Sequence, residues 1–157
     1  MRAASGLVLM LVLAGAAWAA GEPVLKLSPK LRAALVAEMA GLKEGSAELA
    51  ATLATGDWAR ASQRALKMRD SYILKQKLTR AELAELEHAL PREFAEMDAR
   101  FHRHAEALAH AAERRDAELS AFYFFRMLDG CMSCHTRYAT HVLPGFAAPA
   151  PAPAHAH

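Results

Sequence analysis

The spacing of the apolar residues is the feature of this sequence that most constrains its fold. Apolar residues recur at three- and four-residue steps along most of the chain, which places them on one face of a helix. The first such stripe comprises Leu31, Leu35, Met39, Leu42, Leu49 and Leu53, with Ser46 in register. No segment alternates between apolar and polar residues as a half-buried strand would. The sequence therefore predicts an all-α protein.

Local boundary signals divide this pattern into helices. Cap residues, prolines at first helical positions and a terminating glycine predict four long helices of roughly 18–27 residues, with a short helix between the second and third. The signals are Ser28-Pro29 and Gly56 for the first long helix, Asp57 for the second, whose stripe extends to Tyr72, Thr79-x-x-Glu82 for the short one, Pro91 for the third long helix and Asp116 for the fourth. Short links between amphipathic helices predict an antiparallel four-helix bundle.

The two ends of the chain differ from the helical part. Residues 1–20 contain Arg2, then an apolar run, and end in Ala17-Trp18-Ala19-Ala20, which has the A-x-A pattern of a cleavage site. This order predicts a secretory signal peptide. The mature domain would span residues 21–143 and act outside the cytoplasm. Residues 144–157 are rich in proline, alanine and histidine, a composition that predicts a disordered tail.

The charge balance excludes some classes of partner. Lys and Arg total 19 against 17 Asp and Glu, a net charge of +2. Binding to nucleic acid would need a dense basic stripe, which this balance disfavours. No apolar run after residue 20 is long enough to predict a membrane span. Two cysteines are also too few for a disulfide-scaffold protein.

The motif that carries chemistry is Cys131-Met132-Ser133-Cys134-His135, near the end of the fourth long helix. C-x-x-C-H is the attachment sequence for c-type haem. Residues three apart share a helix face, so both thiols can add to the two vinyl groups of one porphyrin, and His135 can then reach the iron. A thioredoxin-type pair would need a βαβ context, and a structural zinc site would usually need four ligands. A disulfide between the two cysteines remains an alternative.

With its signal peptide, four long helices and this motif, the chain resembles the cytochrome c′ and cytochrome c-556 family over about residues 26–140. Tyr138 matches the aromatic residue that follows the haem histidine by three in that family. The family often has arginine directly after this aromatic, whereas this chain has Ala139 there and Arg137 on the other side of the tyrosine. The resemblance therefore assigns no residue of this chain to the role that the family arginine has on the histidine side of the haem.

The resemblance implies one haem c lodged in the bundle, with His135 as its axial ligand. In relatives a residue of the first helix covers the opposite face of the haem. Some relatives carry a methionine ligand there and transfer electrons, whereas others leave the iron five-coordinate and bind nitric oxide or carbon monoxide. Met39 is the sole methionine of the first long helix, and it is either this ligand or core filler.

Four other residues are candidates for the haem pocket. Phe124 and Leu128 lie seven residues before Cys131 and His135, so each pair shares a helix face. Tyr138 follows from the resemblance. Arg32 lies two turns before Met39 and is either a partner for a haem propionate or a solvated surface residue.

The remaining methionines and histidines have simpler interpretations. Met68 and Met97 lie on apolar stripes and are expected in the core, and only one of His102 and His104 is expected to face inward. Gly41 and Gly45 interrupt the first long helix, which indicates a close approach there by haem or by another helix.

Together these features predict a periplasmic monohaem cytochrome that passes single electrons to redox partner proteins. A five-coordinate haem protein that binds a small gas is the alternative. An enzyme would need an acid–base group over the open haem face, and the first helix offers no histidine. The resemblance also suggests a homodimer.

Overall fold

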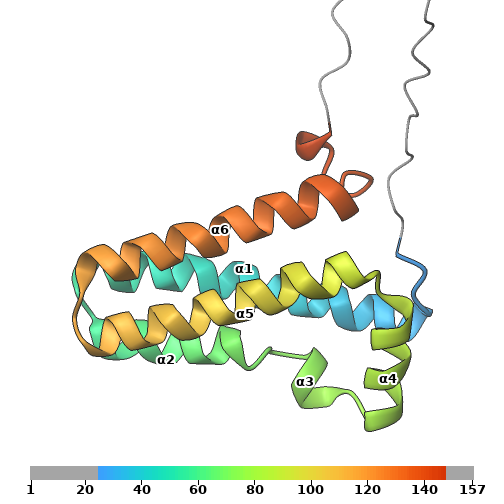
Figure 1. Ribbon diagram of the computed structural model, residues 1–157, viewed down its shortest axis with the longest axis horizontal. Coiled ribbons are helices and arrows are strands. Elements are labelled where there is room, and N and C mark those ends of the chain that lie inside the picture. The colour runs from blue at the N-terminus through green and yellow to red at the C-terminus, as the bar shows by residue number, and fades with distance from the viewer. Residues whose placement is uncertain (1–24, 148–157) are drawn as a thin grey trace, which may run out of the picture.

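The computed structural model describes residues 25–147 (Figure 1). Helices account for 81% of these residues, and no strand occurs among them, so the predicted all-α class is confirmed. The predicted signal peptide, residues 1–20, lies outside the described residues, as do residues 148–157 of the predicted tail. Within the described range, no helix combines the length and the apolar character needed to cross a membrane.

The described residues form six α-helices and one short 3-10 helix. In chain order they are α1 (Pro29–Thr55), α2 (Trp58–Arg69), α3 (Leu74–Lys77), α4 (Arg80–Ala89), α5 (Arg92–Glu113), α6 (Ala117–Tyr138) and η1 (Pro144–Phe146).

The boundary signals lie at the helix ends that the sequence indicates, although the Ser28 side chain makes no capping hydrogen bond to α1. Gly56 ends α1 in the left-handed conformation, with φ 69°, which glycine adopts without strain. The Asp116 carboxylate accepts a hydrogen bond from the Leu119 N–H at 2.9 Å and so caps α6. Thr79 and Glu82 form the predicted capping box of α4. Hydrogen bonds, first from Lys30 and then from Thr79, lower the pKa of Glu82 to about 2.

The second helix is shorter than its apolar stripe predicts. It ends at Arg69, and Ser71 takes the left-handed conformation with φ 66°. The reason lies in α1, because the Glu38 carboxylate accepts hydrogen bonds from the backbone N–H groups of Tyr72 at 2.9 Å, Ile73 at 2.6 Å and Leu74 at 3.1 Å. These N–H groups begin the short helix α3 instead of continuing α2.

Two apolar clusters hold the helices together. The first joins α1, α2, α5 and α6 and is built around Leu49, Met68, Phe101, Leu108 and Met127. The second joins the segment before α1 with α1, α4, α5 and α6 and is built around Leu27, Leu31, Leu86, Phe94 and Tyr138. Figure 1 shows α6 diverging from α1 toward its C-terminal end. The cysteine motif lies in this diverging half of α6.

Helix α5 is buried on two sides, which corrects the expectation that only one of its two central histidines faces inward. His102 faces α2, where its Nδ1 lies 3.0 Å from the Met68 carbonyl oxygen. His104 faces α6, where its ring lies 6.1 Å from the ring of Tyr123. Both histidines are half-buried because α5 packs against α2 and α6 at once.

The two glycines of α1 do mark a close approach, and the approaching group is a tyrosine ring. A Cβ atom on Gly41 would lie 2.9 Å from Cγ of Tyr72, and one on Gly45 would lie 2.5 Å from the Tyr72 hydroxyl oxygen. Glycine is therefore required at both positions to admit the ring of Tyr72, which follows α2.

Replacing Gly45 with alanine should destabilise the protein by up to about 2 kcal/mol. Overpacking of a filled site costs about 1–3 kcal/mol, and the gain in helix propensity offsets about 1 kcal/mol. Gly130→Ala is the matched control, because its Cβ would meet only Phe101 at an ordinary 3.7 Å. Denaturant unfolding should show Gly130→Ala at least as stable as the parent protein. Equal stability of the two variants would contradict the close contact at Gly45.

Candidate haem-attachment site

The last turns of α6 direct both cysteines of the motif toward the core. Cys131 is half-buried and packs against the first apolar cluster, and Cys134 is half-buried and packs against the second. Both thiols are free. Their spacing of three residues puts them on one side of the helix, where the two clusters meet. A group bound to both sulfurs would therefore lie along the inner side of α6.

The surroundings of the thiols keep them protonated at neutral pH. Burial raises the pKa of Cys131, and burial together with the charge of Asp98 and the neighbouring Cys131 raises the pKa of Cys134 to about 11. Catalytic cysteines that exchange disulfides have lowered pKa values, because the thiolate is their nucleophile. The site is thus poorly suited to thioredoxin-type exchange.

His135 is half-buried beside the thiols. Its ring makes an edge-on contact with the ring of Phe146, with centroids 5.6 Å apart. Phe146 belongs to η1, which occupies the first residues of the segment predicted to be a disordered tail. Burial lowers the pKa of His135 and so favours the neutral imidazole, which is the form that ligates a metal.

The C-terminal end of α6 is anchored to the start of α5. Tyr138 is buried, and its ring meets that of Phe94 edge-on at 5.3 Å. Arg137 forms an ion pair with Glu93 at 2.6 Å and lies 5.9 Å from the centroid of the Tyr138 ring. Arg137 is thus engaged with α5. These contacts fix the position of the preceding motif, and they give Tyr138 a structural role in the site.

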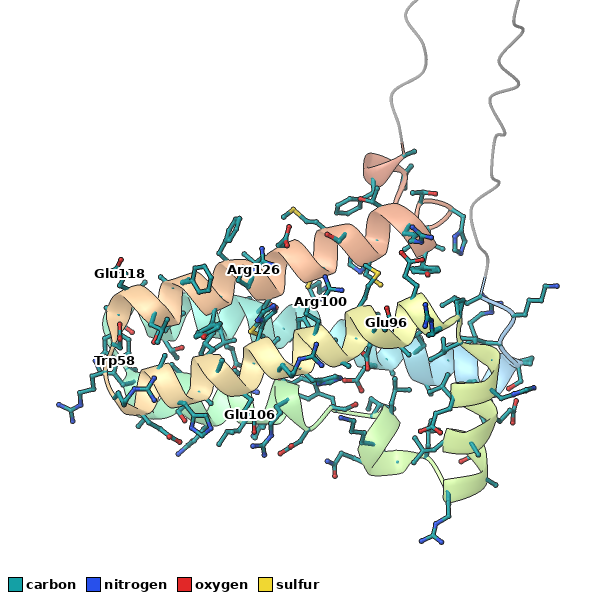
Figure 2. All side chains as sticks on the ribbon, viewed as in Figure 1. Trp58, Glu96, Arg100, Glu106, Glu118 and Arg126 are labelled. Atoms are coloured by element: carbon teal, nitrogen blue, oxygen red, sulfur yellow. The ribbon has the colours of Figure 1, made fainter. Side chains whose placement is uncertain are left out.

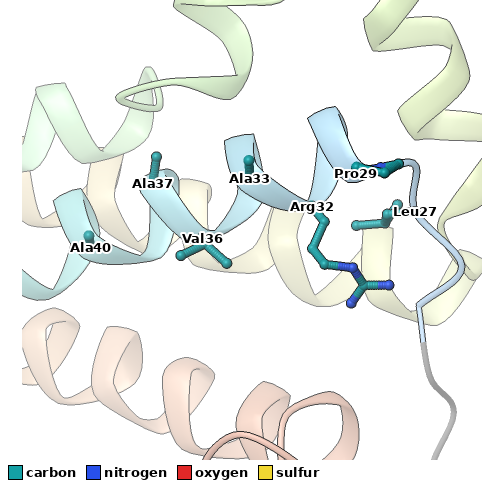
Figure 3. Close-up of a pocket in the computed structure, with 7 residues that line it drawn as sticks. All are labelled: Leu27, Pro29, Arg32, Ala33, Val36, Ala37 and Ala40. Carbon is teal, nitrogen blue, oxygen red and sulfur yellow. The ribbon is translucent and has the colours of Figure 1, made fainter.

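A shallow groove of about 790 Å³ runs along the N-terminal half of α1. Its lining is mostly apolar and small, and consists of Leu27, Pro29, Arg32, Ala33, Val36, Ala37 and Ala40. Figure 3 shows Arg32 and Val36 extending from α1 toward the ribbon of α6. The Arg32 side chain is exposed and donates one hydrogen bond to the Leu25 carbonyl at 3.2 Å.

Met39 lies outside both apolar clusters and is 37% exposed. Its side chain therefore does not fill the core. Met68 is fully buried in the first cluster and Met97 packs against the second, as expected for core methionines. Of these three methionines, Met39 is the one whose side chain packs in neither cluster.

The two residues chosen by seven-residue spacing differ in burial. Phe124 packs against the first cluster, as Cys131 does, so this pair shares an inward face. Leu128, which shares a face of α6 with His135, is 36% exposed. Several other large apolar side chains of α1 and α6 are exposed as well, namely Val36, Met39, Phe122, Phe125 and Met132. Ordinary core packing therefore leaves substantial apolar surface on these two helices.

An adjacent face of α6 meets α5 around a pocket of about 40 Å³. Arg100 of α5 and Arg126 of α6 line it, and both are labelled in Figure 2. Ser133, between the two cysteines, lines it too. His104 completes this side, and burial, followed by the charges of Arg126 and other arginines, lowers its pKa. This face of α6 is polar, in contrast to the face that carries the thiols.

The residues of the motif fit a covalently attached haem. Two free thiols lie on one helix face, a neutral imidazole follows them, and uncovered apolar side chains lie on the same helix and on α1. The motif can be identified from the sequence, but the roles of Phe146 and Glu38 cannot. The contact of Phe146 with His135 and the hydrogen bonds of Glu38 to distant backbone groups both depend on the tertiary fold. Within residues 25–147, no three His, Cys, Asp or Glu side chains cluster as ligands of a directly bound metal ion would.

Comparisons with protein-family models, with curated proteins and with solved structures found no match to this chain.

Proposed function

We propose that this protein is an exported monohaem c-type cytochrome that transfers single electrons. Its haem would be bound covalently through Cys131 and Cys134, with His135 and Met39 as axial ligands. The long helices α1, α2, α5 and α6 would form an antiparallel four-helix bundle around it. The observation that carries this proposal is the pair of free thiols on one inward face of α6, followed directly by a neutral imidazole.

Each residue of the site would have a distinct part. The two cysteines anchor the group, and His135 supplies the nitrogen ligand from the same helix. Contacts of Tyr138 and Arg137 with α5 hold the end of α6, so the imidazole stays in place. The haem iron supplies the one-electron redox couple, whose potential depends on axial ligation and burial.

Helix α1 would cover the other face of the group. Its exposed Met39 offers a soft sulfur ligand, and the apolar lining of its groove would exclude water from the porphyrin. Arg32 extends from this groove toward α6 and keeps donor groups available for a propionate (Figure 3). Periplasmic redox proteins would be the electron partners, and the predicted signal peptide supports that location.

The alternative is a haem protein that binds nitric oxide or carbon monoxide. The observation that favours it is the row of small side chains, Ala33, Ala37 and Ala40, on the groove of α1. Such side chains leave space beside the haem face for a diatomic ligand. This alternative requires that Met39 does not bind the iron.

Covalent attachment is tested most directly on the wild-type protein purified from a host that attaches c-type haem. The haem should remain with the polypeptide on denaturing electrophoresis and after acid extraction, because thioether bonds survive both. A peroxidase stain of the gel and the spectrum of the extract are the measurements. Complete release of haem from the denatured chain would refute the assignment of Cys131 and Cys134.

A further inference from the structure

The pocket of about 40 Å³ between α5 and α6 has no part in the function proposed above. A space of about 10–15 Å³ holds one water molecule, so this pocket has room for a group of about three or four non-hydrogen atoms. Its polar lining consists of Arg100, His104, Arg126, Asp129 and Ser133.

Arginine charge dominates this pocket. Arg100 has no ion-pair partner among residues 25–147. Arg126 pairs with Asp129 at 3.3 Å, but a guanidinium has five N–H donors, and one carboxylate does not engage all of them. Two arginines and one aspartate leave one net positive charge at the pocket. The pocket therefore favours an anion over a cation.

One wall of the pocket contains a polar atom without a partner. The Nε2 atom of His104 is buried and makes no hydrogen bond to any described residue. Burial, followed by the charges of Arg126, Arg103 and Arg100, lowers the pKa of His104, so the neutral imidazole carries a single N–H. An unpaired buried polar group costs free energy, and a ligand oxygen in the pocket would supply the missing acceptor.

Ser133 adds a hydroxyl group whose hydrogen-bonding capacity is unused. Serine and threonine hydroxyls within helices often bond to the carbonyl four residues earlier, as those of Ser46 and Thr136 do at 2.9 and 2.8 Å. In the part of the chain that the structure describes, the Ser133 side chain makes no hydrogen bond. It is exposed and lines the pocket, so its hydroxyl is available to a ligand there.

We propose that this pocket binds a small oxyanion, of the carboxylate or phosphate type, whose oxygens accept hydrogen bonds from Arg100, Arg126 and Ser133. Guanidinium groups present pairs of N–H donors at the spacing of the oxygens of such groups. The site goes beyond the proposed function and does not depend on haem, because each donor belongs to the chain itself. Gly130 and Ser133 flank Cys131, so the anion would lie beside the cysteine motif.

Isothermal titration calorimetry of the purified full-length protein tests the proposal. Inorganic phosphate and acetate are titrated separately in Tris buffer at constant ionic strength, with chloride as the reference anion. We expect saturable binding of at least one of the two oxyanions at one site per chain, and no saturable binding of chloride. Binding of phosphate alone would identify a tetrahedral ligand, and binding of acetate alone would identify a carboxylate.

Arg100→Gln should weaken this binding by about tenfold, because a hydrogen bond between charged groups is lost. Arg100 is exposed, so its replacement should leave the fold intact, which circular dichroism checks. Arg103→Gln is the matched control, since Arg103 is also an exposed arginine of α5 but does not line the pocket. Its affinity for the oxyanion should be nearly that of the parent protein.

Three results would overturn the proposal. They are the absence of saturable binding of both oxyanions, equal binding of chloride, and an equal loss of affinity in the two arginine variants, which would indicate general attraction to positive charge. Haem content is measured on the same preparation. Covalent haem without oxyanion binding would refute this site alone, and oxyanion binding by a chain without haem would refute the proposed function alone.

Discussion

Replacing both Cys131 and Cys134 with alanine should leave the protein without haem and without a cooperative unfolding transition. The porphyrin would be the largest apolar group in the core, and loss of a buried group of that size leaves a cavity or a collapsed, loosely packed interior. We expect a helical species with little fixed tertiary structure. Far-ultraviolet circular dichroism should retain its helical signal, and near-ultraviolet dichroism should be lost.

The basis of this expectation is the apolar surface that protein packing leaves uncovered. Val36 is 64% exposed on α1, and Leu128 and Met132 are exposed on α6. Ser133→Ala is the control, because this residue lies between the cysteines and on another face of α6. The control should retain haem and a sharp melt. A double cysteine variant that melts as sharply as the wild-type protein would contradict a haem-dependent fold.

The helix boundaries could be predicted from the sequence because their causes are local. Asp116 caps α6 by bonding to Leu119, three residues later, and Thr79 and Glu82 complete their capping box within one turn. The end of α2 could not be predicted this way. It depends on Glu38, which bonds to backbone groups 34 to 36 residues further along the chain. A buried glutamate in an apolar stripe gives no local sign of such a partner.

The residues of the candidate site also fall into two groups, those that local spacing identifies and those whose role depends on the tertiary fold. Cys131, Cys134 and His135 form a contiguous motif whose spacing fixes their common face, so the sequence alone identifies them. Gly41 and Gly45 predict a close approach to the first helix, but the sequence does not identify the approaching group. That group is the ring of Tyr72, which contacts α1 from the segment after α2. The environment of Met39 also required the fold, because periodicity places it on the apolar stripe, whereas the packed helices leave it partly exposed.

Met39→Ala should convert the oxidised protein from a low-spin to a high-spin species. Thioether ligation of ferric haem gives a weak far-red absorption band, which should be present in the wild-type protein and absent from the variant. The reduced variant should bind carbon monoxide readily, since the sixth position would be open. His/Met ligation also raises the potential of a c-type haem, so the variant should have a lower reduction potential.

Met132→Ala is the matched control for this prediction. Met132 is also an exposed methionine, but it belongs to α6, the helix that carries His135, so it would share the side of a bound haem with the imidazole. Its replacement should leave the far-red band intact. A wild-type protein that is high-spin and binds carbon monoxide readily would show that Met39 does not ligate the iron. The small side chains of the α1 groove would then border an open coordination position, and gas binding would replace electron transfer as the function that this arrangement supports.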